Sequence, residues 1–321
     1  CATSATNNLP LPYSLQFNTP SNLKNPYAYQ PGHIGIQIMN MNNATATMPT
    51  SGVVFGSQFN SSFNLFDQIG TGVEVTEASL TTMNNVFQSM LHYYDGAGNP
   101  VGGTGIKHSV SSLMNAGLYL DPPVANYNPD FGNRFWDCYY AVEGYNVYEA
   151  KINHAIVRSN QQPWTAGQFV AGYTGILLQS NRFNYDVSNN QFNNINDCIV
   201  MPLTSGSYFV NGNAGSGIVA DNIAIKSNYF GPEVSSNMPA GNEYINHAVR
   251  VDLPNGGGLV PAAGTGLFIH SNNLDRVFRG ISVVGMDTYP TEINGNLISH
   301  MDDYIFGQPQ KGIDVRKTLD N

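Results

Sequence analysis

Charged residues are scarce in this sequence, and lysine and arginine are the scarcest of them. Only 11% of the 321 residues are charged, against about 25% in an average soluble domain. There are 13 lysines and arginines and 22 acidic residues, which gives a formal net charge of −9. Because nucleic acids and anionic membrane surfaces are bound through basic faces, we expect neither as a partner.

The sequence also lacks long apolar runs and cysteine frameworks. No run approaches the roughly 20 apolar residues of a membrane span, so we predict no transmembrane segment. The 3 cysteines have neither disulfide-framework nor zinc-site spacing. A phosphate loop, a dinucleotide fingerprint and a nucleophile elbow are likewise missing. We therefore expect no metal site and no cofactor.

The cysteines themselves fall into two kinds. Cys138 and Cys198 stand at apolar or small positions of the repeat described below, so we expect buried thiols that act as small apolar groups. Cys1 leaves two interpretations open. It is either the acylated first residue of a bacterial lipoprotein, which would anchor the chain to lipid, or an arbitrary start within a longer protein.

A repeat runs through most of the chain. Residues 269–283 (IHSNNLDRVFRGISV) align without a gap on residues 187–201 (VSNNQFNNINDCIVM). The shared pattern is Asn, any, large apolar, two of any kind, apolar, two of any kind, small, aliphatic. Its asparagine recurs at Asn85, Asn133, Asn190, Asn228, Asn272 and Asn296.

Two shorter signals accompany this repeat. Its second half returns as INHAI at 152–156, INDCI at 195–199, INHAV at 245–249 and VFRGI at 277–281. A Thr/Ser-Gly-aliphatic triplet, as in Thr71-Gly72-Val73, predicts a tight corner before a strand. Short alternating apolar stretches favour strands, and a unit of about two dozen residues with inserts of variable length is typical of a solenoid.

Residues 52–321 resemble a right-handed parallel β-helix, the fold of pectate lyases, polygalacturonases, phage tailspikes and many bacterial surface proteins. The low charge and the Asn- and Gly-rich inserts are similar to those of secreted and surface β-helix proteins of Bacteroidetes-type bacteria. The resemblance implies an all-β solenoid in which the six asparagines stack as an internal ladder. We predict an extended N-terminal lead-in over residues 1–32 and a β-helix domain over 33–321, continued or capped beyond 321.

One candidate site comes from the residue before the small position of the repeat. In the four copies this residue is His154, Asp197, His247 and Arg279. If the register holds, they form a column with neighbours about 5 Å apart, and acid, base and cation in one row suit polysaccharide cleavage. However, Ala141 and Ala155 both fit the small position and lie too close in sequence for one coil. His154 is therefore less secure than the others. The alternative is that all four are solvated turn residues.

Aromatic residues in or beside the inserts form the second candidate site. Tyr94, Tyr127, Trp164 and Tyr173 have asparagine, aspartate or glycine neighbours, as do many sugar-stacking platforms. The alternative is that these rings pack the inserts onto the wall of the coil.

These observations favour an extracellular bacterial structural and adhesive surface protein, a segment of a larger surface or filament protein that presents loops to carbohydrate or partner subunits. The alternative is a polysaccharide lyase or glycoside hydrolase acting along one face. No capping element follows residues 311–321 (KGIDVRKTLDN). We therefore expect other subunits or the remainder of a longer chain to stack at the C-terminal end, because an uncapped solenoid exposes core and backbone edges.

Overall fold

The described residues of the computed structural model form a right-handed parallel β-helix of three parallel sheets, as the repeat predicted. The structure describes residues 16–18, 34–39, 53–56, 63–94, 100–110, 116–121, 132–159, 164–165, 168–169, 173–179, 184–202, 222–232, 245–253, 266–285, 290–300, 304–305, 308–309 and 311–316. The chain visits sheets A, B and C in turn, and each round makes one coil. No helix occurs in these ranges.

Each sheet collects one strand from each coil. Sheet A holds β1 (Gln16–Asn18), β4 (Asn64–Asp67), β7 (Asn85–Gln88), β12 (Arg134–Trp136), β15 (Ile156–Arg158), β20 (Gln191–Asn193), β23 (Tyr229–Gly231), β26 (Asn273–Asp275) and β29 (Leu297–Ser299). Sheet B holds β2 (Ile34–Met39), β5 (Thr71–Thr76), β10 (Thr104–Ser109), β13 (Tyr140–Tyr145), β18 (Thr174–Gln179), β21 (Asp197–Pro202), β24 (Ile245–Asp252), β27 (Val277–Val284) and β32 (Lys311–Arg316). Sheet C holds β3 (Val53–Phe55), β6 (Leu80–Thr82), β11 (Gly117–Leu120), β14 (Glu149–Asn153), β19 (Asn184–Ser188), β22 (Asn222–Lys226), β25 (Gly266–His270) and β28 (Thr291–Asn294).

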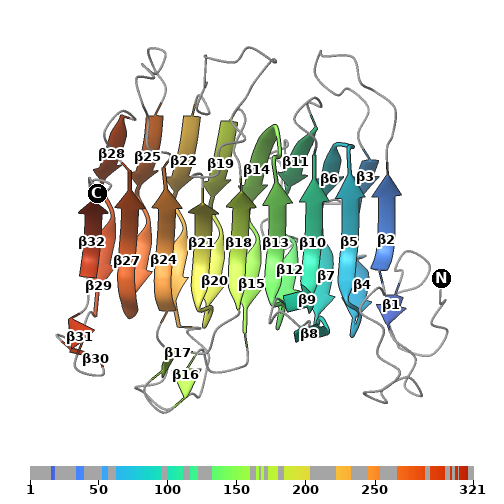
Figure 1. Ribbon diagram of the computed structural model, residues 1–321, viewed down its shortest axis with the longest axis horizontal. Coiled ribbons are helices and arrows are strands. Elements are labelled where there is room, and N and C mark those ends of the chain that lie inside the picture. Colours follow the sequence, from blue (N-terminus) through green and yellow to red (C-terminus); the bar gives the residue numbers. More distant parts are fainter. Residues whose placement is uncertain are drawn as a thin grey trace.

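Three antiparallel hairpins interrupt the coils at one edge. They are β8 (His92–Tyr94) with β9 (Pro100–Gly102), β16 (Trp164–Thr165) with β17 (Gln168–Phe169), and β30 (Tyr304–Ile305) with β31 (Gln308–Pro309). All three lie in A–B turns, the connections from a sheet A strand to the next sheet B strand. In Figure 1 they line the lower edge, where the strands of sheet B begin.

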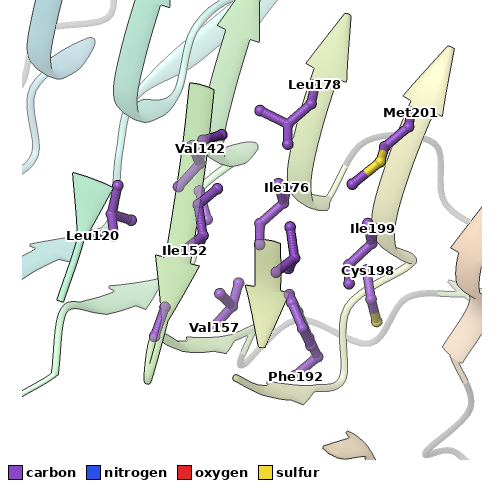
Figure 2. Close-up of a cluster of buried hydrophobic side chains, with 14 of the residues drawn as sticks. Leu120, Val142, Ile152, Val157, Ile176, Leu178, Phe192, Cys198, Ile199 and Met201 are labelled. Atoms are coloured by element: carbon purple, nitrogen blue, oxygen red, sulfur yellow. The ribbon is translucent and has the colours of Figure 1, made fainter. Parts of the chain in front are cut away.

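The core is a set of rows that run along the axis of the helix. Ile176 of β18 lies in register with Val142 and with Ile199 of the neighbouring strands, and all three are buried (Figure 2). Sheet A contributes a row of stacked phenylalanines, in which the Phe66–Phe87 and Phe87–Phe135 ring centroids are 4.7 and 4.9 Å apart. Val157 replaces phenylalanine in the next coil, and the stacking resumes with Phe192 and Phe230 at 5.1 Å.

One row of positions near the start of sheet B holds small residues because the phenylalanine row approaches it closely. A Cβ atom on Gly72 would lie 2.5 Å from Cδ1 of Phe87 and 2.6 Å from the carbonyl oxygen of Gly105. The described Thr-Gly pairs that begin sheet B strands therefore serve close packing, and the expectation that their glycine forms a tight corner was wrong. The register places them in one row with Ala141, Cys198, Ala248 and Gly280.

The asparagine ladder runs beside sheet A. Asn190 donates from its backbone nitrogen and from Nδ2 to Oδ1 of Asn228, at 3.0 Å in both cases. Asn228 does the same to Asn272, and Asn272 to Asn296. Each of these Nδ2 atoms also donates to a carbonyl oxygen of the preceding coil. The amide side chains thus join consecutive coils in the way that the repeat predicted.

The ladder has one break. Ala155 occupies its position between Asn133 and Asn190, because Arg134 pairs with Ile156 and Ile156 with Gln191. Asp121, which directly follows β11 in the coil of Asn133, takes the acceptor role instead. Its Oδ2 lies 2.8 Å from the backbone nitrogen and 2.7 Å from Nδ2 of Asn133. The ladder break and the Phe-row break therefore fall in the same coil.

Candidate functional site

The candidate site is a column of residues near the start of the sheet B strands. We call it the polar column, and its members lie in register from one coil to the next: Thr71, Thr104, Tyr140, Thr174, Asp197, His247, Arg279 and Lys311. Three of the four residues predicted from the repeat are neighbours in it. The spacing of the column is that of the sheet, about 4.8 Å per coil.

His154 is not part of the polar column. It follows β14 in the turn from sheet C to sheet A, with a φ of 54°. The Ile-Asn-His-Ala-Ile segment resembles the other copies of the motif, but its alanine takes the asparagine position of the ladder. Burial lowers the pKa of His154 below its ordinary value. The predicted grouping of His154 with the other three residues was therefore wrong.

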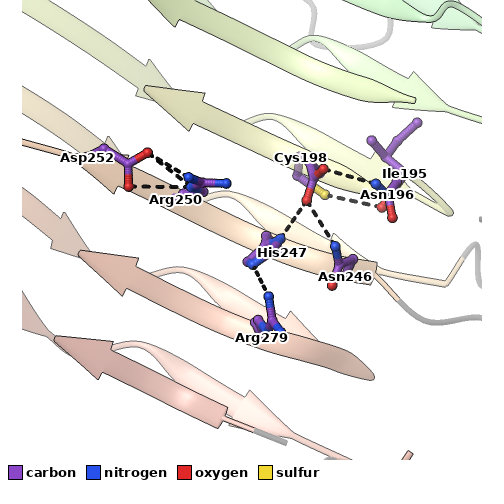
Figure 3. Close-up of polar contacts among 9 residues, drawn as sticks. Ile195, Asn196, Cys198, Asn246, His247, Arg250, Asp252 and Arg279 are labelled. Carbon is purple, nitrogen blue, oxygen red and sulfur yellow. Dashed lines mark hydrogen bonds and ion pairs between the residues drawn. The ribbon is translucent and has the colours of Figure 1, made fainter. Parts of the chain in front are cut away.

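Asp197 and His247 are neighbours in the polar column, and Figure 3 labels His247 with its partner Arg279. Nδ1 of His247 lies 2.6 Å from Oδ1 of Asp197. The side chain of His247 is 10% exposed and that of Asp197 is 25% exposed. The carboxylate also accepts hydrogen bonds from Nδ2 of Asn196, at 3.0 Å, and from Nδ2 of Asn246, at 3.4 Å. Asp197 is thus held in place by three donors.

The contacts of the His247 ring determine its tautomer. Nδ1 faces a carboxylate oxygen, so it carries the proton and donates. Nε2 lies 3.0 Å from Nη1 of Arg279, and a guanidinium can only donate. Nε2 must therefore be the acceptor, and His247 is neutral with its proton on Nδ1. The result is a directional chain of hydrogen bonds, from Arg279 to His247 and from His247 to Asp197.

Arg279 ends this chain at the surface. Its side chain is exposed, and its guanidinium carbon lies 5.3 Å from the centre of the Phe278 ring. A cation over a ring face is attracted by the ring quadrupole. The histidine and the ring thus both contact the guanidinium of Arg279.

The aromatic candidates are only partly described. Tyr173 is 9% exposed and lies 6.3 Å from Tyr139, centroid to centroid, so its ring is not available as a stacking surface and that prediction was wrong. Tyr94 lies in β8 and Trp164 in β16, and their side chains fall outside the described part of the structure. Tyr127 lies outside the described residues.

Sequence reasoning missed the residues that surround the pair. Asn196 and Asn246 precede Asp197 and His247, and both orient the carboxylate. The recurrent Ile-Asn before the column residue was the available signal, because two successive coils carry an asparagine at that place.

Three general properties of the described residues bear on the chemistry. No helix that could cross a membrane occurs among the described residues. Within the same ranges, no group of three histidines, cysteines, aspartates or glutamates could hold a metal ion. Cys138 and Cys198 are buried, and burial raises the pKa of each thiol well above its ordinary value. Neither sulfur is therefore a ready nucleophile.

The fold and the polar column are not matched by a characterised relative. Comparisons with protein-family models, with curated proteins and with solved structures found no match to this chain.

Proposed function

We propose that this chain is an extracellular bacterial structural and adhesive protein that binds carbohydrate along the polar column. The observation that carries the proposal is the Asp197–His247–Arg279 chain of hydrogen bonds, which spans three successive coils on the surface. Charged and amide groups spaced by the coil repeat can meet the hydroxyl groups of an extended, repetitive ligand. The low charge of the sequence and its solenoid repeat support the extracellular, structural part.

The surroundings of the polar column suit a long ligand. Hairpins β8–β9, β16–β17 and β30–β31 lie beside the starts of the sheet B strands (Figure 1). Farther along the same strands the outward side chains include Tyr145, which is 47% exposed, and the half-buried Leu177 and Val200. Leu177 and Val200 lie in register with Glu143 and Arg250, so this face combines apolar, aromatic and charged side chains. Sugar rings can pack on its aromatic members.

Binding is better supported than cleavage. Glycoside hydrolysis by the usual route needs two carboxyl groups about 5–9.5 Å apart across the bond. Asp197 is the one carboxylate among the described members of the polar column. Asp252 stands at the far end of β24, five residues from His247, or about 16 Å along an extended strand. Nε2 of His247 already accepts a hydrogen bond from Arg279, so it is not free to take a proton from a substrate.

The structural part of the proposal includes a partner at the C-terminal end of the solenoid. Ile313 and Val315 continue the interior rows of Ile281 and Val283, yet they are 51% and 45% exposed. Exposed core rows and unpaired strand edges favour stacking of another subunit or of further coils of the same protein.

Affinity electrophoresis tests the binding proposal. The protein is run through native gels that contain one of a panel of soluble polysaccharides, and its migration is compared with that in a gel without polysaccharide. We expect retardation by at least one member, and loss of the retardation in an Asp197→Asn/His247→Leu double variant. The matched control is Asp186→Asn/Lys226→Leu, which removes an ion pair of 3.1 Å from sheet C. Equal retardation of both double variants would reject the polar column as the binding surface.

The same panel separates binding from cleavage. Release of reducing ends, or of an unsaturated product absorbing in the ultraviolet, would indicate hydrolysis or elimination. Turnover that disappears in His247→Leu would replace the binding proposal by the enzymatic alternative.

A further inference from the structure

Arg279 differs from most of the other described cations in its partners. Ion pairs with a carboxylate are made by Lys107, Lys151, Lys226, Arg250, Lys311 and Arg316. Arg279 forms no ion pair within the described part of the chain, and its polar partner there is the neutral His247 ring. It is nevertheless exposed, and it lies between His247 and Lys311 in the polar column.

The partners of Arg279 orient it without neutralising it. His247 accepts one hydrogen bond at 3.0 Å and carries no charge in this tautomer. Asp197, which holds His247 from the other side at 2.6 Å, is separated from the guanidinium by the whole imidazole ring. Only one of the five N–H groups of the guanidinium is used by this contact. A preoriented guanidinium with free donors is suited to two-pronged binding of a carboxylate or sulfate.

The described carboxylates of the neighbouring strands do not pair with Arg279. Lys311 follows Arg279 in the polar column, and its ammonium group pairs with Asp314 at 3.1 Å. On the adjacent strand β24, Arg250 pairs with Asp252 at 2.9 Å. These carboxylates are therefore engaged by their own cations, and Arg279 stays available to a ligand.

We infer that Arg279 binds an anionic substituent, a carboxylate or a sulfate, of the carbohydrate ligand, with His247 and Asp197 as its positioning residues. The inference rests on the proposed carbohydrate binding and narrows its ligand class. The neutral histidine fixes the direction of the guanidinium, and Asp197 fixes the histidine. Loss of either positioning residue should weaken recognition of the anionic group more than contact with the sugar backbone.

The test uses one sugar backbone in three forms. Dextran, carboxymethyl-dextran and dextran sulfate are compared in affinity gels and by calorimetric titration at equal ionic strength. Should dextran derivatives not be bound, the backbone that the wild type retains in the first panel is carboxymethylated and sulfated instead. The wild type should bind at least one charged form about 10-fold to 100-fold more tightly than the neutral form, as expected for charge-assisted hydrogen bonds.

The variants are chosen to separate specific recognition from general attraction. Arg279→Gln should lose this preference, and Arg279→Lys should recover only part of it because an ammonium lacks the planar fork. His247→Leu should lower the affinity for the charged form more than the affinity for the neutral form, and thermal unfolding shows whether the variant is folded. Arg250→Gln removes an equally exposed arginine that has its own carboxylate, and it should behave as the wild type does.

The outcomes distinguish the inference from the proposed function. An equal loss in Arg250→Gln and Arg279→Gln would overturn the inference, because it would show a general charge effect. Equal binding of the charged and neutral forms by the wild type would overturn it as well and leave carbohydrate binding standing. If inorganic sulfate alone saturates the site at Arg279 and the sugar adds no affinity, the inference is overturned in favour of a simple anion site. Binding of no polysaccharide in any form would reject the proposed function itself.

Discussion

Asn133 donates two hydrogen bonds to a single oxygen of the Asp121 carboxylate, from its backbone nitrogen at 2.8 Å and from Nδ2 at 2.7 Å. In the coils from Asn190 onward the same two donors bind the Oδ1 atom of an asparagine, at 2.9–3.0 Å. Asp121 therefore substitutes for the amide that Ala155 lacks. Unlike an amide, it brings an ionisable group into a fully buried place.

This substitution predicts a pH-dependent stability. Burial raises the pKa of Asp121 from 3.8 to about 7, against the opposing effect of the hydrogen bonds from Asn133. Between these values the folded chain holds a proton that the unfolded chain has lost, so the free energy of unfolding falls as the pH rises. Asp121→Asn keeps an acceptor for Asn133 and removes the titration. We expect it to be more stable than the wild type by about 1–3 kcal/mol at pH 8, and by less at pH 5.

Urea unfolding of both proteins at pH 5 and pH 8 provides the measurement. If the free energies of unfolding of the two proteins differ by the same amount at pH 5 and at pH 8, Asp121 does not titrate in this range.

His108 should give the opposite dependence. It is fully buried in β10, with Nε2 2.6 Å from the carbonyl oxygen of Ala78, and burial lowers its pKa from 6.5 to about 4. Its contribution is fully present above pH 6.5 and is lost as the pH falls through 4, because the unfolded chain takes up the proton first. His108→Leu should therefore flatten the acid limb of the stability curve by about 1–3 kcal/mol between pH 6.5 and 4.

Asp121 acts in the same range with the opposite sign. The comparison should accordingly be made in the Asp121→Asn background, by unfolding at half-unit pH intervals. If the free energy of unfolding falls equally steeply with decreasing pH in the proteins with and without His108, the lowered pKa of His108 is contradicted.

The asparagine ladder should be costly to interrupt. Asn228→Ala leaves the backbone nitrogen and Nδ2 of Asn190 without their acceptor, and removes the donor to the carbonyl oxygen of Val187. Because buried polar groups left unpaired each cost about 1–3 kcal/mol, we expect a loss of about 2–5 kcal/mol. Asn273→Ala, at an exposed site on the neighbouring strand, should cost less than about 0.5 kcal/mol. Chemical denaturation of the two variants measures both values, and equal losses would argue against the ladder as a stabilising element.

The row of small residues at the start of sheet B should resist enlargement. Gly72→Ala places a methyl group about where the Phe87 ring and the carbonyl oxygen of Gly105 already lie. Overpacking of this kind costs about 1–3 kcal/mol. Ala141→Gly, in the same row, removes a methyl group that the structure accommodates and should cost about 0.5–1 kcal/mol. Thermal unfolding compares the two, and the steric explanation fails if Gly72→Ala is the milder change.

Stacking was the part of the fold that could be predicted from sequence. A residue such as Asn228 occupies the same environment in every coil, so its recurrence reports a repeated physical constraint. The constraint on Gly72 was not visible, because the phenylalanine that approaches it belongs to another part of the coil. For the same reason, the Thr-Gly-aliphatic triplet and the small position of the repeat looked like unrelated motifs, although Gly72 and Cys198 lie in one row.

The candidate site was predictable only in part. Asp197, His247 and Arg279 were found because their coils keep one register from the motif to the start of sheet B. His154 was misplaced because the segment around Ala155 imitates the motif at a different turn. No sequence pattern marks Asp121. It precedes an insert, and it acts as an acceptor because Ala155, in the next coil, lacks the amide of the ladder.

The central claim is that ligand lies along the polar column on one edge of sheet B, and hydroxyl-radical footprinting tests it most directly. The protein is oxidised with and without a saturating amount of the polysaccharide that retards it, and side-chain oxidation is read by mass spectrometry. Our account predicts protection of Tyr140, His247 and Tyr145 on sheet B, with no change at Tyr119 and Phe268 on sheet C. Equal protection of the two sheets, or protection of sheet C alone, would contradict it.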